Sequence, residues 1–141
     1  MDKGIYTLIL KSEGSVIRVG ALGKVTIPKG YLIYVGSAQG PGGLIRVNRH
    51  LLAAHDGRKP HWHIDHLLQD PSIRIIATVS AATKERHECR LADAIGGLCI
   101  PKFGCSDCRC QSHLFLRSID PIESIVQSFT SLGLIAAIRR Y

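Results

Sequence analysis

Gly4-Ile5-Tyr6-Thr7-Leu8-Ile9-Leu10 and Tyr31-Leu32-Ile33-Tyr34-Val35-Gly36-Ser37 are the two stretches of this sequence that decide its fold. Each is short, rich in β-branched and aromatic residues, and bounded by glycine or proline, which is typical of buried strands. A glycine-rich loop over residues 38–43 follows the second stretch. Apolar residues then recur at helical spacing: Leu44, Val47, Leu51 and Leu52. The sequence therefore predicts two strands that lead into an amphipathic helix.

The polar side of this helix is basic. Arg46 and His50 are four residues apart, which places them on the same helix face, with Arg49 beside them. A strand tyrosine, a glycine-rich loop and a basic helix face together suit a phosphate group, and backbone amides at the start of a helix also bind phosphate. The alternative for the loop is a flexible connection.

Length and composition indicate one soluble globular domain over residues 1–141, with 45% hydrophobic and 21% charged residues. A chain of this size buries roughly two thirds of the surface of its unfolded form. The net charge of +7 implies an anionic partner. No stretch is long and apolar enough for a membrane span, and no signal peptide precedes Gly4, so we expect a cytoplasmic protein that does not contact membranes.

The remaining chain predicts further elements of a single α+β domain, with a small mixed or antiparallel central sheet flanked by helices. Ser12–Ser15 has the polar, glycine-containing composition of a hairpin turn, and Asp120-Pro121 is a strong helix start. Leu134–Tyr141 is compatible with a last strand or a packed tail. The other expected elements are strands at Val16–Val19, Lys24–Ile27, Ile73–Val79 (central in the sheet) and Leu114–Leu116, and helices at Trp62–Gln69, Lys84–Ile95 and from Pro121 to about Ser131.

A cysteine-rich loop offers a possible zinc site. Cys99, Cys105, Cys108 and Cys110 have the spacing C-x5-C-x2-C-x-C, with Cys89 left over. Four thiolates in one short loop are compatible with a structural Zn²⁺ site, and buried thiols that pack within the loop are an equal alternative. His63 and His66, three residues apart, are a second candidate metal pair that lacks a third ligand.

Gly4-Ile5-Tyr6, Tyr34-Val35-Gly36 and the following Arg46 resemble the signature of the GIY-YIG nucleases. Four further motifs narrow the resemblance: Trp62-His63-Ile64-Asp65, Glu88-Cys89, Phe103-Gly104-Cys105-Ser106-Asp107-Cys108-Arg109-Cys110 and Ser112-His113-Leu114-Phe115. With these motifs, the chain more closely resembles a family related to these nucleases, domain of unknown function 123, which is sometimes fused to endonuclease III. The resemblance runs from about residue 3 to about residue 117.

The resemblance implies a divalent-metal-dependent nuclease that acts on phosphodiester bonds, with DNA favoured as substrate. Tyr6 would be the general base, with its pKa lowered from about 10 by nearby cations, and Tyr34 would join its hydrogen-bond network. Arg46 would bind the scissile phosphate, and His50 would donate to the phosphate or the leaving group. Glu88 would bind Mg²⁺ or Mn²⁺, with Glu85 as the rival carboxylate. The expected substrate-binding residues are Gly36, Ser37, Arg49 and His63, and Asp65 is a further candidate.

Two other functions stay open at this stage. The wider nuclease family has an asparagine late in the fold, whereas the single asparagine here is Asn48. Asp107, Ser112 and His113 are candidates to replace it. The departure favours a noncatalytic nucleic-acid-binding module on the same scaffold, and the cysteines alone favour a zinc-stabilised interaction domain.

Overall fold

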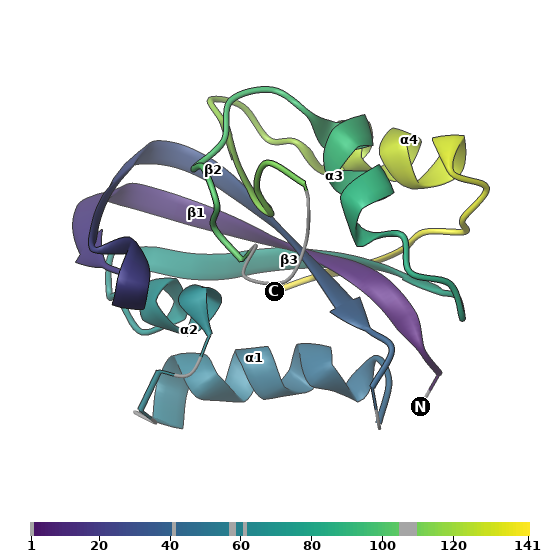
Figure 1. Cartoon of the computed structure of the whole chain (residues 1–141), viewed down its shortest axis with the longest axis horizontal. Helices are drawn as coiled ribbons and strands as arrows, with labels where there is room; N and C mark the ends of the chain where they lie inside the picture. Colours follow the sequence, from purple (N-terminus) through teal and green to yellow (C-terminus); the bar gives the residue numbers. More distant parts are fainter. Residues whose placement is uncertain (1, 41, 57–58, 61, 105–109) are drawn as a thin grey trace.

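A five-stranded antiparallel sheet forms the centre of the protein in a computed structural model that describes residues 2–40, 42–56, 59–60, 62–104 and 110–141 (Figure 1). The elements in chain order are β1 (Gly4–Arg18), a 3₁₀ turn (Gly20–Leu22), β2 (Lys24–Ala38), α1 (Ile45–Asp56), α2 (His63–Leu68), β3 (Ile73–Ala82), α3 (Glu88–Ile95), β4 (Leu114–Arg117), α4 (Ile122–Ser131) and β5 (Ala137–Arg140). The strand order is β4-β2-β1-β3-β5. The predicted α+β class is confirmed.

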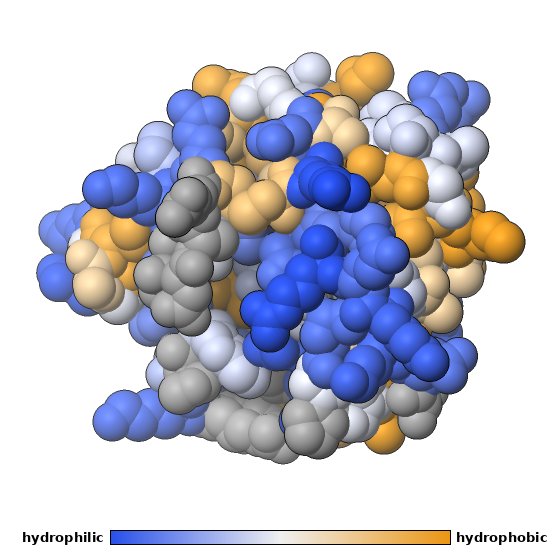
Figure 2. Space-filling view, turned by 45° about the vertical axis from the view of Figure 1, so that its right-hand side comes forward, coloured by the Kyte–Doolittle hydropathy of each residue, from blue (hydrophilic) through white to orange (hydrophobic). Residues whose placement is uncertain are grey.

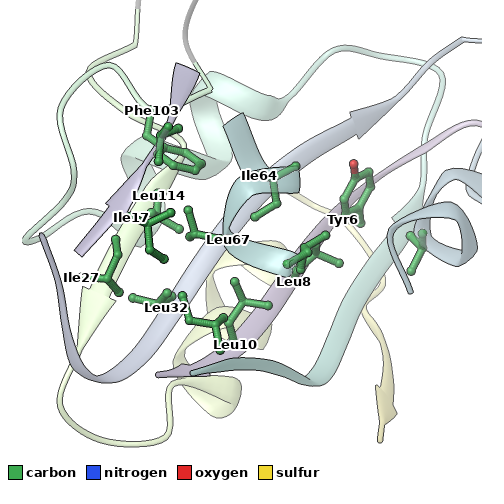
Figure 3. Packing of buried hydrophobic residues seen from close by; sticks show 14 of the residues in the cluster. Tyr6, Leu8, Leu10, Ile17, Ile27, Leu32, Ile64, Leu67, Phe103 and Leu114 are labelled. Atoms are coloured by element: carbon green, nitrogen blue, oxygen red, sulfur yellow. The ribbon is translucent and has the colours of Figure 1, made fainter. Parts of the chain in front are cut away.

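The middle strand β1 contributes to cores on both faces of the sheet because successive side chains of a strand point to opposite sides. Tyr6, Leu8 and Leu10 pack beneath α1 and α2, whereas Ile5 and Ile9 pack beneath α3 and α4. Figure 1 shows these two helix pairs on opposite sides of the sheet. Tyr6 lies at one end of the first cluster (Figure 3). The sheet is therefore covered on both faces, and its tyrosine face is the one beneath the basic helix α1.

The hairpin predicted at Ser12–Ser15 is wrong, because β1 continues through this segment to Arg18. Gly14 does take a positive φ of 95°, as a turn residue would, but Glu13 still pairs with Lys29 and Ser15 with Ile27. The actual turn is the 3₁₀ segment Gly20–Leu22. The two short strands expected on β2 likewise form one strand. A local turn composition was overridden by a continuous ladder between two long strands.

The helix predicted at Lys84–Ile95 is α3, and it begins at Glu88, later than the predicted Lys84. The side-chain amide of Gln39 donates hydrogen bonds to the carbonyl oxygens of Thr83 and Glu85, at 2.9 and 3.3 Å. The Thr83 hydroxyl in turn accepts one from the backbone N–H of Glu85, at 3.2 Å. These contacts hold residues 83–85 in a non-helical turn, so Glu88 becomes the first residue of α3.

The C-terminal elements agree with the sequence patterns. The Asp120 carboxylate accepts a hydrogen bond from Ile122 N–H at 3.0 Å just before α4, whose N-cap residue is Pro121, and this helix ends at Ser131 as expected. β3 lies between β1 and β5, so it is an inner strand, although β1 occupies the middle of the sheet. The segment left open as strand or tail contains β5. In the described part of the chain, no helix combines the length and apolar character required to span a bilayer.

Candidate functional site

Tyr6 and His50 meet beneath α1 in a buried hydrogen bond. The phenol oxygen of Tyr6, on β1, lies 2.6 Å from Nε2 of His50, on α1. Tyr6 is 1% and His50 2% exposed. The strand face and the helix face that were expected to converge therefore do converge, and the Tyr6 hydroxyl and Nε2 of His50 satisfy each other.

Burial governs the protonation of this pair. It raises the pKa of Tyr6 well above its ordinary range, with the nearby Tyr34 adding to the increase, and Arg46 opposes this only in part. Burial and Arg46 lower the pKa of His50 to about 4, while the Asp65 carboxylate opposes that decrease. Near neutral pH both groups are therefore neutral, and with the phenol as donor the imidazole carries its own proton on Nδ1. The lowered Tyr6 pKa expected from nearby cations is not found.

Tyr34 extends the site beyond the buried pair. Leu8 pairs with Tyr34 and Tyr6 with Gly36, so the two tyrosines are diagonal neighbours on one face of the sheet. The half-buried Tyr34 ring meets the His50 ring edge-on at 6.3 Å between centroids. On its other side it contacts Phe103 in the same manner, at 6.2 Å. Tyr34 thus links the hydrogen-bonded pair to the loop before β4.

Arg46 is held at the surface edge of the site with part of its hydrogen-bonding capacity unused. Its guanidinium carbon lies 4.4 Å from the centroid of the half-exposed Trp62 ring, a cation–π arrangement. One terminal nitrogen donates to the Ser37 carbonyl oxygen at 3.3 Å. Nε of Arg46 is buried and meets no acceptor among the residues that the structure describes. A guanidinium placed in this way is prepared to bind an anion.

The residues predicted to bind substrate differ in their surroundings. Gly36 gives the Tyr6 phenol its space, because a Cβ at this position would overlap the phenol carbon and hydroxyl. Ser37 contributes its carbonyl oxygen to Arg46, and Arg49 is exposed on α1. His63 accepts a hydrogen bond from Gly104 N–H through Nδ1, at 2.8 Å, so it anchors the loop after Phe103.

Asp65 places a negative charge under the same site. It is buried, and its carboxylate accepts a hydrogen bond from Trp62 N–H at 2.9 Å at the start of α2. Its electrostatic effect reaches both Tyr6 and His50. At the start of α2, Trp62 therefore contacts Arg46, and the charge of Asp65 acts on His50. Spacing alone did not reveal this role of Trp62.

Glu88 lies on a different part of the molecule from the tyrosine–histidine pair. It is the half-buried first residue of α3, on the opposite face of the sheet from α1. Its charge raises the pKa of His113, although burial lowers that pKa more strongly. His113 in turn lies against Gly104, which also adjoins the Tyr34 ring. The charge of Glu88 therefore acts on His113, and both His113 and Tyr34 adjoin Gly104.

The carboxylate of Glu88 fits a hard divalent cation. Its Oε2 atom is buried and, within the described ranges, has no hydrogen-bond partner. A buried carboxylate oxygen is costly to leave unsatisfied, and one carboxylate together with waters and phosphate oxygens is a common arrangement for Mg²⁺. The rival Glu85 is exposed and lies 3.3 Å from His87 Nε2.

The described residues do not bring the predicted zinc ligands Cys99 and Cys110 together. Cys105 and Cys108, as well as Asp107, lie outside the described residues. Cys99 packs in the core cluster beneath α3 and α4, and its backbone forms an antiparallel β-bridge with Phe115. Cys110 instead contacts His113, with 2.8 Å between Sγ and Nε2. Cys89, which the spacing left over, lies with these two residues.

Residues 5–134 match the model of the family described as Domain of unknown function DUF123. The chain belongs to the DUF123 family. The match covers every element of the DUF123 domain from β1 to α4, and therefore every site residue named above. No curated protein and no solved structure matches the chain.

The side of the DUF123 domain where β2 ends and α1 begins is largely polar. Figure 2 brings this side forward and shows hydrophilic residues across its middle, with hydrophobic ones at the top and at the sides. A largely polar surface at the start of α1, in a chain with a net charge of +7, suits an anionic partner.

Proposed function

We propose that this DUF123 domain is related to the GIY-YIG nucleases and hydrolyses phosphodiester bonds in nucleic acid, DNA in preference to RNA, with Mg²⁺ or Mn²⁺. The observation that carries the proposal is the convergence of Tyr6, His50 and Arg46 from β1 and α1 with Tyr34 from β2. Phosphodiester hydrolysis needs a proton acceptor for water and a positive group for the phosphoryl oxygens. This cluster contains both.

The hydrogen bond between Tyr6 and His50 supports a proton relay from water through the phenol to the imidazole. Because the pKa of Tyr6 is raised, the phenol acts as a relay: its oxygen accepts the proton of the attacking water as its own proton moves to His50 Nε2. The products are a hydroxide-like nucleophile, a neutral phenol and an imidazolium. The buried Asp65 carboxylate favours that imidazolium, since it raises the proton affinity of His50.

Arg46 is the proposed phosphate ligand. Nε and the terminal nitrogens of a guanidinium form a planar fork that matches two phosphate oxygens, and Trp62 fixes the plane of this fork. Glu88 would hold the divalent cation, which supplies Lewis-acid stabilisation of phosphoryl charge when bound. Arg49, exposed one turn from Arg46, would contact a neighbouring phosphate.

A second function is favoured by one specific observation. Tyr6 and His50 are almost fully buried and satisfy each other, as in a structural polar pair. Under this reading the domain binds nucleic acid through Arg46, Trp62 and Arg49 and does not cleave it. Both functions predict salt-dependent binding, and only the first predicts a product.

A cleavage assay separates the two functions. End-labelled single-stranded, duplex and branched DNA and the matching RNA would be incubated with the protein and Mg²⁺ or Mn²⁺. We expect cleavage that is lost in Tyr6→Phe and Glu88→Ala and retained in the matched controls Tyr31→Phe and Glu85→Ala. Binding without any product in the wild type would establish the noncatalytic function. Equal cleavage by Tyr6→Phe, Glu88→Ala and the wild type would refute the proposed site.

A further inference from the structure

Three potential metal ligands meet outside the tyrosine site, from two separate segments of the chain. Cys89 is the second residue of α3, and Cys110 and His113 precede β4. The sulfur atoms of Cys89 and Cys110 and a ring nitrogen of His113 all lie within 4.8 Å of one another. Cys89 is half-buried and His113 is 7% exposed, so the group lies partly inside the protein.

We propose that Cys89, Cys110 and His113 bind Zn²⁺. Two thiolates and one imidazole are a characteristic zinc donor set. Bonds of about 2.3 Å to sulfur and 2.0 Å to nitrogen in a tetrahedron place the ligand atoms roughly 3.5–3.8 Å apart. A group whose ligand atoms lie within 4.8 Å needs only side-chain rotation to reach that arrangement.

The backbone holds the histidine ligand firmly in place. Its carbonyl oxygen accepts a hydrogen bond from Val35 N–H, and its own N–H donates to the Phe103 carbonyl oxygen, both at 2.9 Å. The first contact fixes His113 to β2 and the second fixes it to the loop that carries Gly104. A ligand anchored to the sheet in this way is preorganised, so binding requires little ordering of the chain at this point.

The proposed zinc site differs from the Mg²⁺ site proposed at Glu88. Thiolate and imidazole donors favour Zn²⁺, whereas a carboxylate oxygen favours Mg²⁺. Because Cys89 is adjacent to Glu88, zinc would fasten the first turn of α3 to the segment before β4 and so position Glu88. Cys99 packs in the core beneath α3 and α4 and pairs with Phe115, so it is not part of the site.

Metal analysis of the wild-type protein is the first test. Protein purified under reducing conditions, without added chelator, would be assayed for zinc by mass spectrometry. We expect about one Zn²⁺ per chain, and less than about a tenth of an equivalent would overturn the proposal. Zinc removed by a chelator should be replaceable by Co²⁺, which would give thiolate-to-metal charge-transfer absorption in the near ultraviolet.

Single substitutions assign the ligands. Cys89→Ser and His113→Asn should each lower zinc content several-fold, whereas the matched control Cys99→Ser should retain it. Circular dichroism would show whether each variant is folded, and Co²⁺ titration of the wild type tests thiolate ligation without any variant. Undiminished zinc in folded Cys89→Ser would overturn the proposal. Zinc content does not depend on nuclease activity, so the two proposals fail separately.

Discussion

The phenol oxygen of Tyr6 and Nε2 of His50 lie 2.6 Å apart in a buried hydrogen bond, and this bond fastens α1 to the middle strand of the sheet. A donor and an acceptor that satisfy each other inside a core contribute little when paired but cost much when one is removed. With the phenol as donor, His50 must be neutral, because an imidazolium has no acceptor nitrogen. Stability, pH dependence and the proposed proton relay therefore depend on one contact.

Removal of the Tyr6 hydroxyl should destabilise the protein. Tyr6→Phe leaves Nε2 of His50 buried without its donor, so we expect the free energy of unfolding to fall by about 1–3 kcal/mol. Tyr31→Phe removes the hydroxyl of a half-buried tyrosine on β2 and should change it by less than about 0.5 kcal/mol. Urea denaturation followed by circular dichroism measures both. A Tyr6→Phe protein as stable as the wild type would contradict the role of this bond.

Protonation of His50 should lower the free energy of unfolding in mild acid. Its pKa is about 4 in the folded protein and about 6.5 in an unfolded chain, so the unfolded chain binds more protons between these values. Stability contributed by neutral His50 is thus fully present above pH 6.5 and is lost as the pH falls towards 4, by about 2–3 kcal/mol. Denaturation at a series of pH values should show a shallower dependence in His50→Gln. Parallel curves for the two proteins would exclude this role of His50.

Gly36 should tolerate no side chain while Tyr6 is present. The Cβ of Gly36→Ala would overlap the Tyr6 phenol, and such overpacking costs about 1–3 kcal/mol of stability. In Gly40→Ala the added Cβ meets no heavy atom of the described residues within 4 Å, so this control should be nearly neutral. The double variant Gly36→Ala/Tyr6→Leu should be less destabilised than the sum of the single changes. Additive effects would show that the two positions do not compete for space.

Arg46 should contribute to nucleic-acid affinity through its shape as well as its charge. Arg46→Lys keeps the charge but loses the planar fork and the stacking on Trp62, so we expect affinity to fall roughly 5- to 30-fold, or about 1–2 kcal/mol. The slope of log affinity against log salt should stay unchanged, since the number of charges is the same. Arg74→Lys, at an exposed position on β3, is the control. Fluorescence anisotropy with labelled DNA measures all three proteins, and equal affinities would remove Arg46 from the interface.

Much of the fold could be predicted because local rules decide it. The apolar runs in β1, β2 and β3 specify strands, and Asp120 with Pro121 specifies the start of α4. The predicted turn around Gly14 was wrong, since a long partner strand overrode its composition. The predicted start of α3 at Lys84 was wrong as well, because α3 begins at Glu88. The distant side chain of Gln39 holds the preceding turn, and such a contact leaves no trace in local sequence.

The sequence by itself determined the fold class, the positions of most elements and the placement of Tyr6, Tyr34, Arg46 and His50 on adjoining faces, because periodicity fixes which side chains share a face. Only the tertiary structure decided the chemistry of those residues. Burial makes Tyr6 a neutral donor and His50 a neutral acceptor, and it depends on what packs above them. Likewise, Cys89 meets Cys110 and His113 only because the sheet brings the start of α3 to the segment before β4.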